Sequence, residues 1–331
     1  QLDILTRRMS QKKFAALKNI QLLIVDQLHL LGSAHGPFLE VVLSRLRQFA
    51  STSKTTTPPR IVALSAPLAF AKDAASWLGV TSAHLFNFHP SARPFPLEIS
   101  LQSFDLPSFG DRWAAMQKPA ILRIRAHMEE CQAVAADGMD SGEGSTGAGA
   151  GAGASVLVYV PSRREAVFFA RQLAAKLAST TESELMPPLL HCTPEQLQAF
   201  TTGMQDQTLL SLLQAGIGYF HVAMNAREQT AVKLLFEAGA LSCLIVVANS
   251  IYAMPCSASL VVVMGTEVFD GREHRYAALP YADILQMVGR ARGTVLPSGR
   301  VSLFCYTPRR EGLKKFLFEP LPVESHLDTD M

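Results

Sequence analysis

The sequence predicts an α/β fold in which helices cover parallel sheets. Short apolar runs rich in branched side chains alternate with segments whose apolar residues recur about every 3.6 positions. The length of 331 residues corresponds to two domains, each large enough to bury its own core. Hydrophobic residues make up 48% of the chain and charged residues 18%, which excludes wholesale disorder.

The expected strands and helices follow one another along the chain. Buried strands are predicted where a run is short, apolar and rich in valine, isoleucine and leucine, at residues 20–25, 60–64, 155–160, 241–247, 260–264 and 300–305. The apolar spacing of amphipathic helices occurs at residues 36–49, 69–78, 162–178 and 225–238. Because parallel sheets bind ligands at the carboxyl ends of their strands, the residues after these strands are the candidates for chemistry.

Two polar stretches interrupt this alternation. Residues 137–154 (DGMDSGEGSTGAGAGAGA) contain no side chain that could fill a core, so we expect a disordered Gly/Ala-rich insertion there. Residues 51–59 (STSKTTTPP) predict a loop before the second strand.

Charge and cysteine content narrow the class of protein. Lys and Arg number 30 and Asp and Glu 28, so the net charge of +2 gives no broad positive field, and nucleic acid would have to bind in a local groove. Five scattered cysteines without a CxxC pair predict neither a disulfide framework nor a zinc site, and fit a reducing compartment. No apolar run approaches the roughly 20 residues of a membrane span, so we expect a soluble intracellular protein without a membrane partner. Because residue 1 is Gln, we expect a piece of a longer or trimmed chain.

The first candidate site is the sequence LLIVDQLHLLG at residues 22–32. An aspartate at a strand's carboxyl end, here Asp26, can hold the Mg²⁺ of a nucleoside triphosphate, and an acidic residue after it can orient the attacking water. The next residue is Gln27, whose neutral amide cannot accept a proton, and losing a positioned general base costs about 10²–10⁴ in rate. Capping a turn or helix is the alternative role for Asp26.

A second candidate is the turn after the strand at residues 60–64. The hydroxyl of Ser65, followed by Ala66 and Pro67, could couple two sites, although an ordinary turn explains this tripeptide equally well.

A third candidate is the start of the helix that follows VLVYV at residues 156–160. Ser162 and Glu165 have the spacing of a capping box. A helix N-terminus flanked by Arg163 and Arg164 is also suited to bind phosphate.

The fourth candidate is QMVGRARG at residues 286–293. Gln286 and Arg290 lie four residues apart and could face one ligand from one helical face, and an arginine aimed at a transferring phosphate contributes about 10³–10⁵ in rate. A lone helical arginine more commonly meets solvent or a carboxylate. No G-x-x-x-x-G-K-[ST] loop occurs in the chain, so we expect no ordinary ATP cradle from these residues.

Together these stretches resemble the superfamily-2 DExH-box RNA helicases, and among them the two-cassette spliceosomal helicases of the U5 small nuclear ribonucleoprotein, in their C-terminal cassette. Further segments carry the likeness from end to end: LDILTRR at 2–8, PFLEV at 37–41, KDAASWLG at 72–79, FNFHP at 86–90, LHCT at 190–193 and KKFLFEPLPVESHLD at 314–328. The last two distinguish the chain from the related activating-signal-cointegrator helicases.

The resemblance implies two RecA-like domains with mainly parallel sheets, a partial one at residues 1–117 that lacks the P-loop, and a second at residues 118–331. It implies ATP and Mg²⁺ as the family's cofactors, although the chain lacks the loop that binds them. It also implies RNA, in particular small nuclear RNA, an adjacent active helicase cassette and other spliceosomal proteins as partners, and a nuclear location.

Residue by residue, the first domain matches the family in part. Asp26 matches the Mg²⁺-holding aspartate of the DExH box, and His29 its histidine, which in the family links the nucleotide to the second domain. Gln27 departs from the family at the catalytic glutamate. Ser65 and Ala66 match the coupling motif, with a proline in place of its last residue.

The second domain matches the family in part as well. Ser162 and Arg163 match the motif that helps to grip the nucleic-acid backbone. Ser250 opens SIYAMP, where the family has a tryptophan-glycine pair and a following asparagine that couple RNA to ATP, so the resemblance also implies Ser250 as a nucleic-acid contact. Gln286 and Arg290 match the arginine-finger motif, but the ending Arg-Gly inverts the family's Gly-Arg. A one-residue shift turns a helical side chain by about 100°, so we expect the second finger to be mispointed.

Four departures from the family's pattern affect ATP hydrolysis. They are Gln27 at the position of the general base, the SIYAMP coupling loop, the inverted ending of the arginine-finger motif, and HVAM at 221–224 in place of histidine-x-glycine-leucine. If the losses of the general base and of one arginine finger multiply, the rate of ATP hydrolysis falls by on the order of 10⁵. The leading hypothesis is therefore a catalytically weak pseudo-helicase that serves as a regulatory and docking body. The alternatives are an active ATP-dependent RNA helicase whose P-loop half lies outside this chain and whose Gln27 orients water, and a degenerate fragment that does not fold alone.

Overall fold

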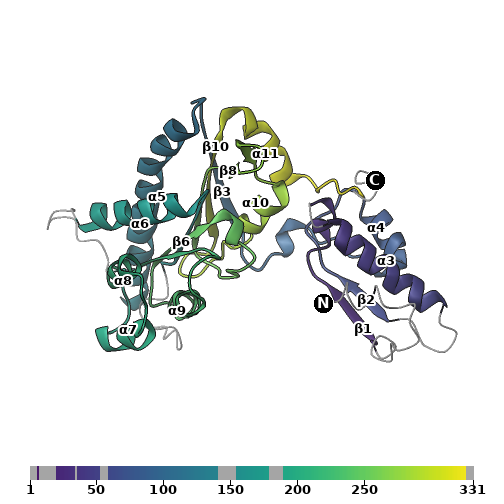
Figure 1. Ribbon diagram of the computed structural model, residues 1–331, viewed down its shortest axis with the longest axis horizontal. Coiled ribbons are helices and arrows are strands. Elements are labelled where there is room, and N and C mark those ends of the chain that lie inside the picture. The colour runs from purple at the N-terminus through teal and green to yellow at the C-terminus, as the bar shows by residue number, and fades with distance from the viewer. Residues whose placement is uncertain are drawn as a thin grey trace. The chain divides into compact units, whose positions relative to one another are not determined.

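The structure, a computed structural model, describes residue 6 and residues 20–33, 36–52, 59–140, 154–178 and 189–325. It divides the chain into two compact units (Figure 1). The first unit comprises residues 1–92 together with 315–331, and the second comprises residues 93–314. The chain therefore begins in the first unit and returns to it at its C-terminal end.

The first unit is built on a pair of parallel strands, β1 (Leu22–Val25) and β2 (Arg60–Ala63), which align in register from Leu22 opposite Arg60 to Val25 opposite Ala63. The 3₁₀ turn η1 (Leu28–Gly32) and the helices α3 (Gly36–Thr52) and α4 (Ala71–Leu78) accompany them. The buried core of this unit joins the strand, the turn and both helices, and consists of Val25, Leu28, Leu31, Leu43 and Leu78.

The second unit contains a six-stranded sheet in the order β3-β10-β7-β4-β6-β5, in which every pair is parallel. Its strands are β3 (Leu97–Phe104), β4 (Val156–Val160), β5 (Ile217–Phe220), β6 (Cys243–Val247), β7 (Leu260–Met264) and β10 (Gly299–Tyr306). All residues of β4, β5, β6 and β7 are buried, as expected for parallel strands that helices cover on both faces.

Helices and one hairpin complete the second unit (Figure 1). The helices are α5 (Phe109–Asp140), α6 (Arg163–Ala178), α7 (Pro194–Thr201), α8 (Gln207–Gln214), α9 (Ala226–Glu237), α10 (Tyr281–Val288) and α11 (Arg310–Phe318), the last of which ends in the first unit. Helix α5 packs against β7 and β10, and α6 against β5 and β6. The strands β8 (Glu267–Asp270) and β9 (Arg275–Ala278) form an antiparallel hairpin.

The structure confirms the predicted α/β class with parallel sheets, which fits RecA-like domains. Each predicted strand and helix overlaps an observed one. Strand β3 was not predicted because its sequence, LEISLQSF, mixes polar and apolar residues on a half-exposed edge of the sheet. Strand β5, IGYF, was not predicted because it is short and contains a glycine.

The boundary between the two units differs from the one predicted after residue 117, which falls inside α5. The units separate between residues 92 and 93, because β3 pairs with β10 from Leu97 opposite Gly299 to Phe104 opposite Tyr306 and so belongs to the second unit. Of the insertion predicted at 137–154, residues 137–140 end α5, and residues 141–153 lie outside the described residues.

Candidate functional site

The DExH-like segment leaves the carboxyl end of β1. Asp26 directly follows the strand and is exposed. Gln27 adopts a left-handed backbone conformation, with φ 57° and ψ 50°, which costs an L-residue with a side chain about 1 kcal/mol. Its Oε1 atom is buried and has no hydrogen-bond partner in the part of the chain that the structure describes. The amide oxygen therefore does not face the solvent that surrounds Asp26.

The histidine of this segment contacts the second candidate loop. His29 is 3% exposed, and its Nδ1 atom accepts a hydrogen bond from the backbone N–H of Ala66 across 3.1 Å. An imidazole nitrogen that accepts a hydrogen bond carries no proton, so the neutral ring holds its proton on Nε2. The structure thus brings together His29 and the Ser65–Ala66 turn, in which Ser65 is exposed.

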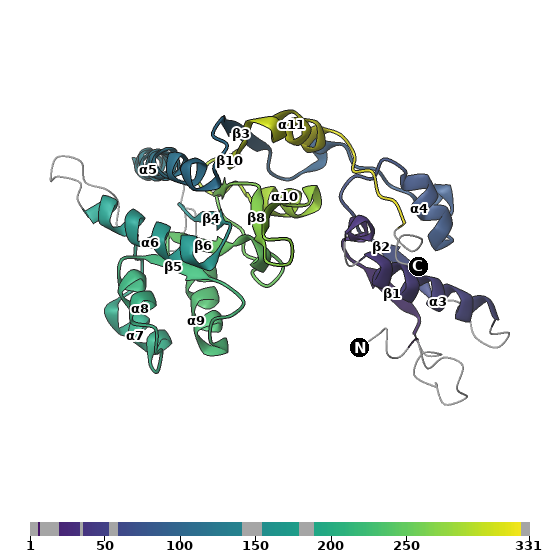
Figure 2. The ribbon, with the colours of Figure 1, turned by 45° about the horizontal axis from the view of Figure 1, so that its top comes forward.

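The C-terminal segment also contacts this loop, a feature that the sequence did not predict. The backbone N–H of Leu321 donates to the carbonyl oxygen of Pro67 across 2.8 Å. The N–H of Ala69 donates to the carbonyl oxygen of Leu321 across 2.9 Å. In Figure 2 the yellow segment that follows α11 ends close to α4, in the unit that includes both. Only the likeness of residues 314–328 to the helicases marked this segment in the sequence.

In the second unit, Ser162 and Arg163 lie at the start of α6, close after β4. The Oγ atom of Ser162 accepts a hydrogen bond from the N–H of Glu165 across 3.5 Å, which is long for such a bond. Among the described residues, no reciprocal bond from the Glu165 side chain is present, so the predicted capping box is one-sided. The guanidinium of Arg163 is exposed, as a phosphate-binding group must be.

Ser250 does not fit the direct contact with nucleic acid that the resemblance implies. Its side chain is fully buried, at 0% exposure, because it joins two loops. The hydroxyl accepts a hydrogen bond from the N–H of Val222 across 3.2 Å and donates one to Oδ1 of Asn249 across 3.1 Å. Burial and the nearby guanidinium of Arg163 lower the pKa of His221, whose ring lies beside the same loop. Ser250 therefore joins the loops that contain Val222 and Asn249 through hydrogen bonds of its buried hydroxyl.

Gln286 and Arg290 do not share a helical face as predicted. Gln286 lies within α10, which ends at Val288, so Arg290 lies beyond the helix. The Nη1 atom of Arg290 donates to the carbonyl oxygen of Pro255 across 3.0 Å. Gly289 follows the helix as its C-cap residue. The guanidinium is thus bonded to the backbone of the SIYAMP loop.

Two neighbouring side chains of these motifs also have partners within the second unit. The guanidinium of Arg292 lies 5.2 Å from the centroid of the Phe95 ring. The hydroxyl of Tyr252 donates to Oδ1 of Asp283 across 2.7 Å. Burial and this carboxylate raise the pKa of Tyr252. The SIYAMP loop is thus tied to α10 through Tyr252, whereas the expected mispointing of the second finger stays a prediction.

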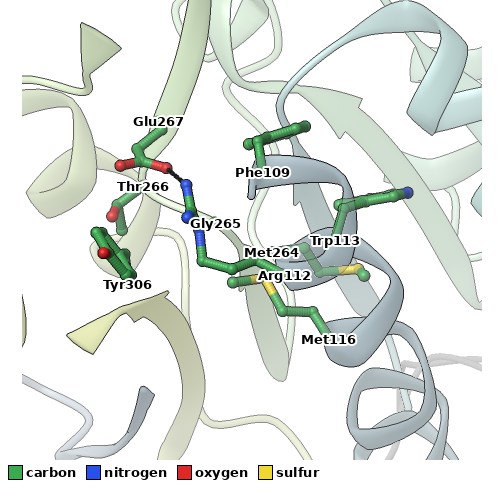
Figure 3. Close-up of a pocket in the computed structure, with 9 residues that line it drawn as sticks. All are labelled: Phe109, Arg112, Trp113, Met116, Met264, Gly265, Thr266, Glu267 and Tyr306. Atoms are coloured by element: carbon green, nitrogen blue, oxygen red, sulfur yellow. Dashed lines mark hydrogen bonds and ion pairs between the residues drawn. The ribbon is translucent and has the colours of Figure 1, made fainter. Parts of the chain in front are cut away.

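A cavity of about 10 Å³ lies beside a buried ion pair in the second unit (Figure 3). Arg112 and Glu267 form this pair across 2.5 Å, with side-chain exposures of 6% and 16%. Arg112 also donates to the carbonyl oxygens of Leu106 and Pro107, each across 2.6 Å. Because this volume holds about one water molecule, the cavity is part of the core packing and does not form a ligand site.

The residues present do not by themselves fit the ATP and Mg²⁺ that the family implies. The exposed carboxylate of Asp26 suits Mg²⁺ as one oxygen ligand. Within the described ranges, however, no three His, Cys, Asp or Glu side chains cluster as a metal site would require. The chain also contains no phosphate-binding loop. A membrane-crossing helix is likewise absent from the described part of the chain, since none is both long and apolar enough.

Comparisons with known proteins identify relatives along almost the whole chain, although no family model matches it. It is 39% identical over 326 residues to the DExH-box ATP-dependent RNA helicase DExH12 of Arabidopsis thaliana. It is 36% identical over 327 residues to the human U5 small nuclear ribonucleoprotein 200 kDa helicase. It is 35% identical over 333 residues to the activating signal cointegrator 1 complex subunit 3-like protein of Dictyostelium discoideum.

Each of these matches covers 98% of the chain and 14% of the relative. The chain therefore corresponds to a small part of these large helicases. The similarity confirms the resemblance that the motifs indicated, and it is spread over both compact units rather than confined to one motif. By its sequence, this chain is similar over almost its whole length to a segment of DExH-box RNA helicases, among them the U5 small nuclear ribonucleoprotein 200 kDa helicase.

Proposed function

We propose that this chain is part of a catalytically weak pseudo-helicase cassette in a spliceosomal U5-type helicase, where it serves as a regulatory and docking body. The observation that carries the proposal is Gln27, a neutral amide at the position of the catalytic carboxylate, with its oxygen buried away from solvent. An amide cannot take the proton from the attacking water, and the loss of a general base costs about 10²–10⁴ in rate.

The arrangement of the arginines supports the same proposal. Arg290 lies beyond the end of α10 and donates to the carbonyl oxygen of Pro255. Arg292 lies over the ring of Phe95. A guanidinium held by its own unit is not free to stabilise a transferring phosphate, a contribution of about 10³–10⁵ in rate where an arginine finger acts.

The partners follow from the relatives. We infer that RNA, in particular small nuclear RNA, meets the chain weakly or through the rest of the protein, because the net charge is only +2. The exposed Arg163 at the start of α6 is the candidate contact to an RNA phosphate. An adjacent active cassette and other spliceosomal proteins are the proposed docking partners, in the nucleus, because relatives are named for the U5 ribonucleoprotein.

Single-turnover ATP hydrolysis by the complete cassette, separated from its partner cassette, tests the proposal. We expect a rate at the uncatalysed background, both with and without RNA. The variant Gln27→Glu is the matched comparison, because it restores the carboxylate without changing the side-chain length. Hydrolysis well above background by the unmodified cassette contradicts the proposal.

The alternative is an active ATP-dependent RNA helicase whose P-loop lies outside this chain. The name of the Arabidopsis relative, an ATP-dependent RNA helicase, favours this alternative. A glutamine can orient an attacking water, as it does in some GTPases. Under this alternative the unmodified cassette hydrolyses ATP, and Gln27→Ala reduces the rate by about 10²-fold, the order of magnitude of misplacing a reacting group.

A further inference from the structure

The Ser65–Ala66–Pro67 loop is bonded through two successive residues to segments far apart in the sequence. The N–H of Ala66 donates to Nδ1 of His29, and the carbonyl oxygen of Pro67 accepts from the N–H of Leu321. The loop is therefore held by both the DExH-like segment and the C-terminal segment. We propose that residues 321–325 form a positioning strap for this loop, with Leu321 as the positioning residue.

The backbone bonds of Leu321 make the strap a short addition to the loop. Leu321 bonds to Pro67 through its N–H and to Ala69 through its carbonyl oxygen, which forms a parallel bridge opposite Leu68. Prolines at positions 320 and 322 limit the backbone of the strap on both sides of this bridge. A segment with little backbone freedom loses less entropy when it binds, so the strap is suited to hold the loop in one conformation.

Side chains anchor the strap to the core of the first unit. Leu321 is 6% exposed, and Val323 packs against the core cluster that contains Leu28 and Leu31. Farther along, the hydroxyl of Ser325 donates to the carboxylate of Glu40 in α3 across 2.9 Å. Since Leu28 and Leu31 belong to the same turn as His29, the strap supports both partners of the His29–Ala66 hydrogen bond.

The position of the strap in the chain gives it a regulatory consequence. It follows α11, which begins in the second unit and ends in the first, so the strap directly continues the chain that connects the two units. If the loop couples nucleotide to nucleic acid, as the proposed membership of a helicase cassette implies, the strap sets the state of that coupling. The inference rests on the proposed function only for this last step.

Amide hydrogen exchange on the full chain tests the strap. The variant Leu321→Ala removes the side-chain anchor, and we expect the amide of Ala66, which the strap does not touch, to exchange about tenfold faster. Amides of β4 in the second unit should keep their rates, because they do not depend on the first unit's loop. The matched control is Ser325→Ala, which removes the outer anchor and should leave the Ala66 rate within about twofold.

The tautomer of His29 is a second readout that a purely structural role would not move. Long-range ¹H–¹⁵N spectra of the unmodified chain should show the proton on Nε2, because Nδ1 accepts from Ala66. In Leu321→Ala we expect a mixture of both tautomers, and Leu321→Ile, which keeps a large apolar side chain, should restore the Nε2–H form.

If Leu321→Ala does not fold, the milder truncation Leu321→Val, which keeps the backbone N–H and shortens the buried side chain, is measured in the same way. Folded Leu321→Ala or Leu321→Val with unchanged Ala66 exchange and an unchanged His29 tautomer overturns the strap. These measurements need no nucleotide. ATP hydrolysis by the complete cassette would therefore overturn the proposed function without affecting the exchange result. Unchanged exchange would overturn the strap without affecting the proposed function.

Discussion

Arg290 donates a hydrogen bond from Nη1 to the carbonyl oxygen of Pro255 across 3.0 Å. This bond joins the residue just beyond α10 to the SIYAMP loop that follows β6. The Nε atom of Arg290 is buried without a partner in the described structure. The geometry therefore favours a structural role for this arginine.

Replacing Arg290 with alanine should destabilise the second unit. The change removes an exposed hydrogen bond to Pro255, and we expect the free energy of unfolding to fall by about 0.5–1.5 kcal/mol. Chemical denaturation of the full chain measures this loss. The matched control is Arg292→Ala, an exposed arginine over the Phe95 ring, for which we expect a loss of about 0.5–1 kcal/mol. A loss for Arg290→Ala that is smaller than the loss for Arg292→Ala would contradict the structural role.

The full-length parent should hydrolyse ATP normally when Gln286 and Arg290 are both replaced by alanine. A pseudo-helicase cassette contributes no hydrolysis, so its degenerate finger motif should not affect the rate of the active cassette. Steady-state hydrolysis with RNA present measures this, and a melting curve of each preparation verifies that the parent is folded. A large loss of activity in a folded variant counts against the pseudo-helicase proposal.

The buried pair of Arg112 and Glu267 should be important for the stability of the second unit. Replacing Glu267 with glutamine keeps the shape of the side chain but leaves the guanidinium of Arg112 without its counter-ion, at 6% side-chain exposure. Breaking a buried pair in this way costs about 3–5 kcal/mol. Thermal or chemical denaturation checks this value.

A surface pair on α5 provides the control for that prediction. Arg125 and Glu129 form an exposed pair four residues apart, so Glu129→Gln should cost only about 0.3–0.5 kcal/mol. Similar effects of Glu129→Gln and Glu267→Gln would show that burial does not strengthen the dependence on the Arg112–Glu267 pair.

The stability of the second unit should decrease in mild acid because of His127. Burial, followed by the charge of Arg300, lowers the pKa of this imidazole from 6.5 to about 4. Above pH 6.5 the ring is neutral in both states and contributes no pH dependence. Between pH 6.5 and about 4 only the unfolded chain binds the proton, so the free energy of unfolding falls as pH decreases, by up to about 3 kcal/mol.

Denaturation midpoints at several pH values test this dependence in the unmodified chain and in His127→Gln. Glutamine does not titrate and can still bond to the hydroxyl of Ser259, the partner of His127 at 2.8 Å. The variant should lose less stability between pH 6.5 and 4.5 than the unmodified chain. Because burial also lowers the pKa of His191 and of His221, some acid sensitivity remains in both. Parallel pH profiles would refute the assignment to His127.

The sequence alone was sufficient for the α/β class and for the order of most elements. The period of the apolar residues reports local backbone geometry, so the buried runs at β4, β6 and β7 were predicted directly. The resemblance to the DExH-box helicases could also be recognised from the sequence, because its motifs come after predicted strands. Asp26 and Gln27 were predicted to follow β1, and the structure places them there.

Only the tertiary structure decided how the candidate residues are used. Burial of Ser250, the position of Arg290 beyond α10 and the bridge between Leu321 and Leu68 all depend on contacts between distant segments. Nearly every residue has the same backbone N–H and C=O groups. The sequence therefore does not indicate which distant carbonyl oxygen accepts a hydrogen bond from a given N–H. Local periodicity therefore determined the elements, whereas long-range backbone pairing determined the environment of the site.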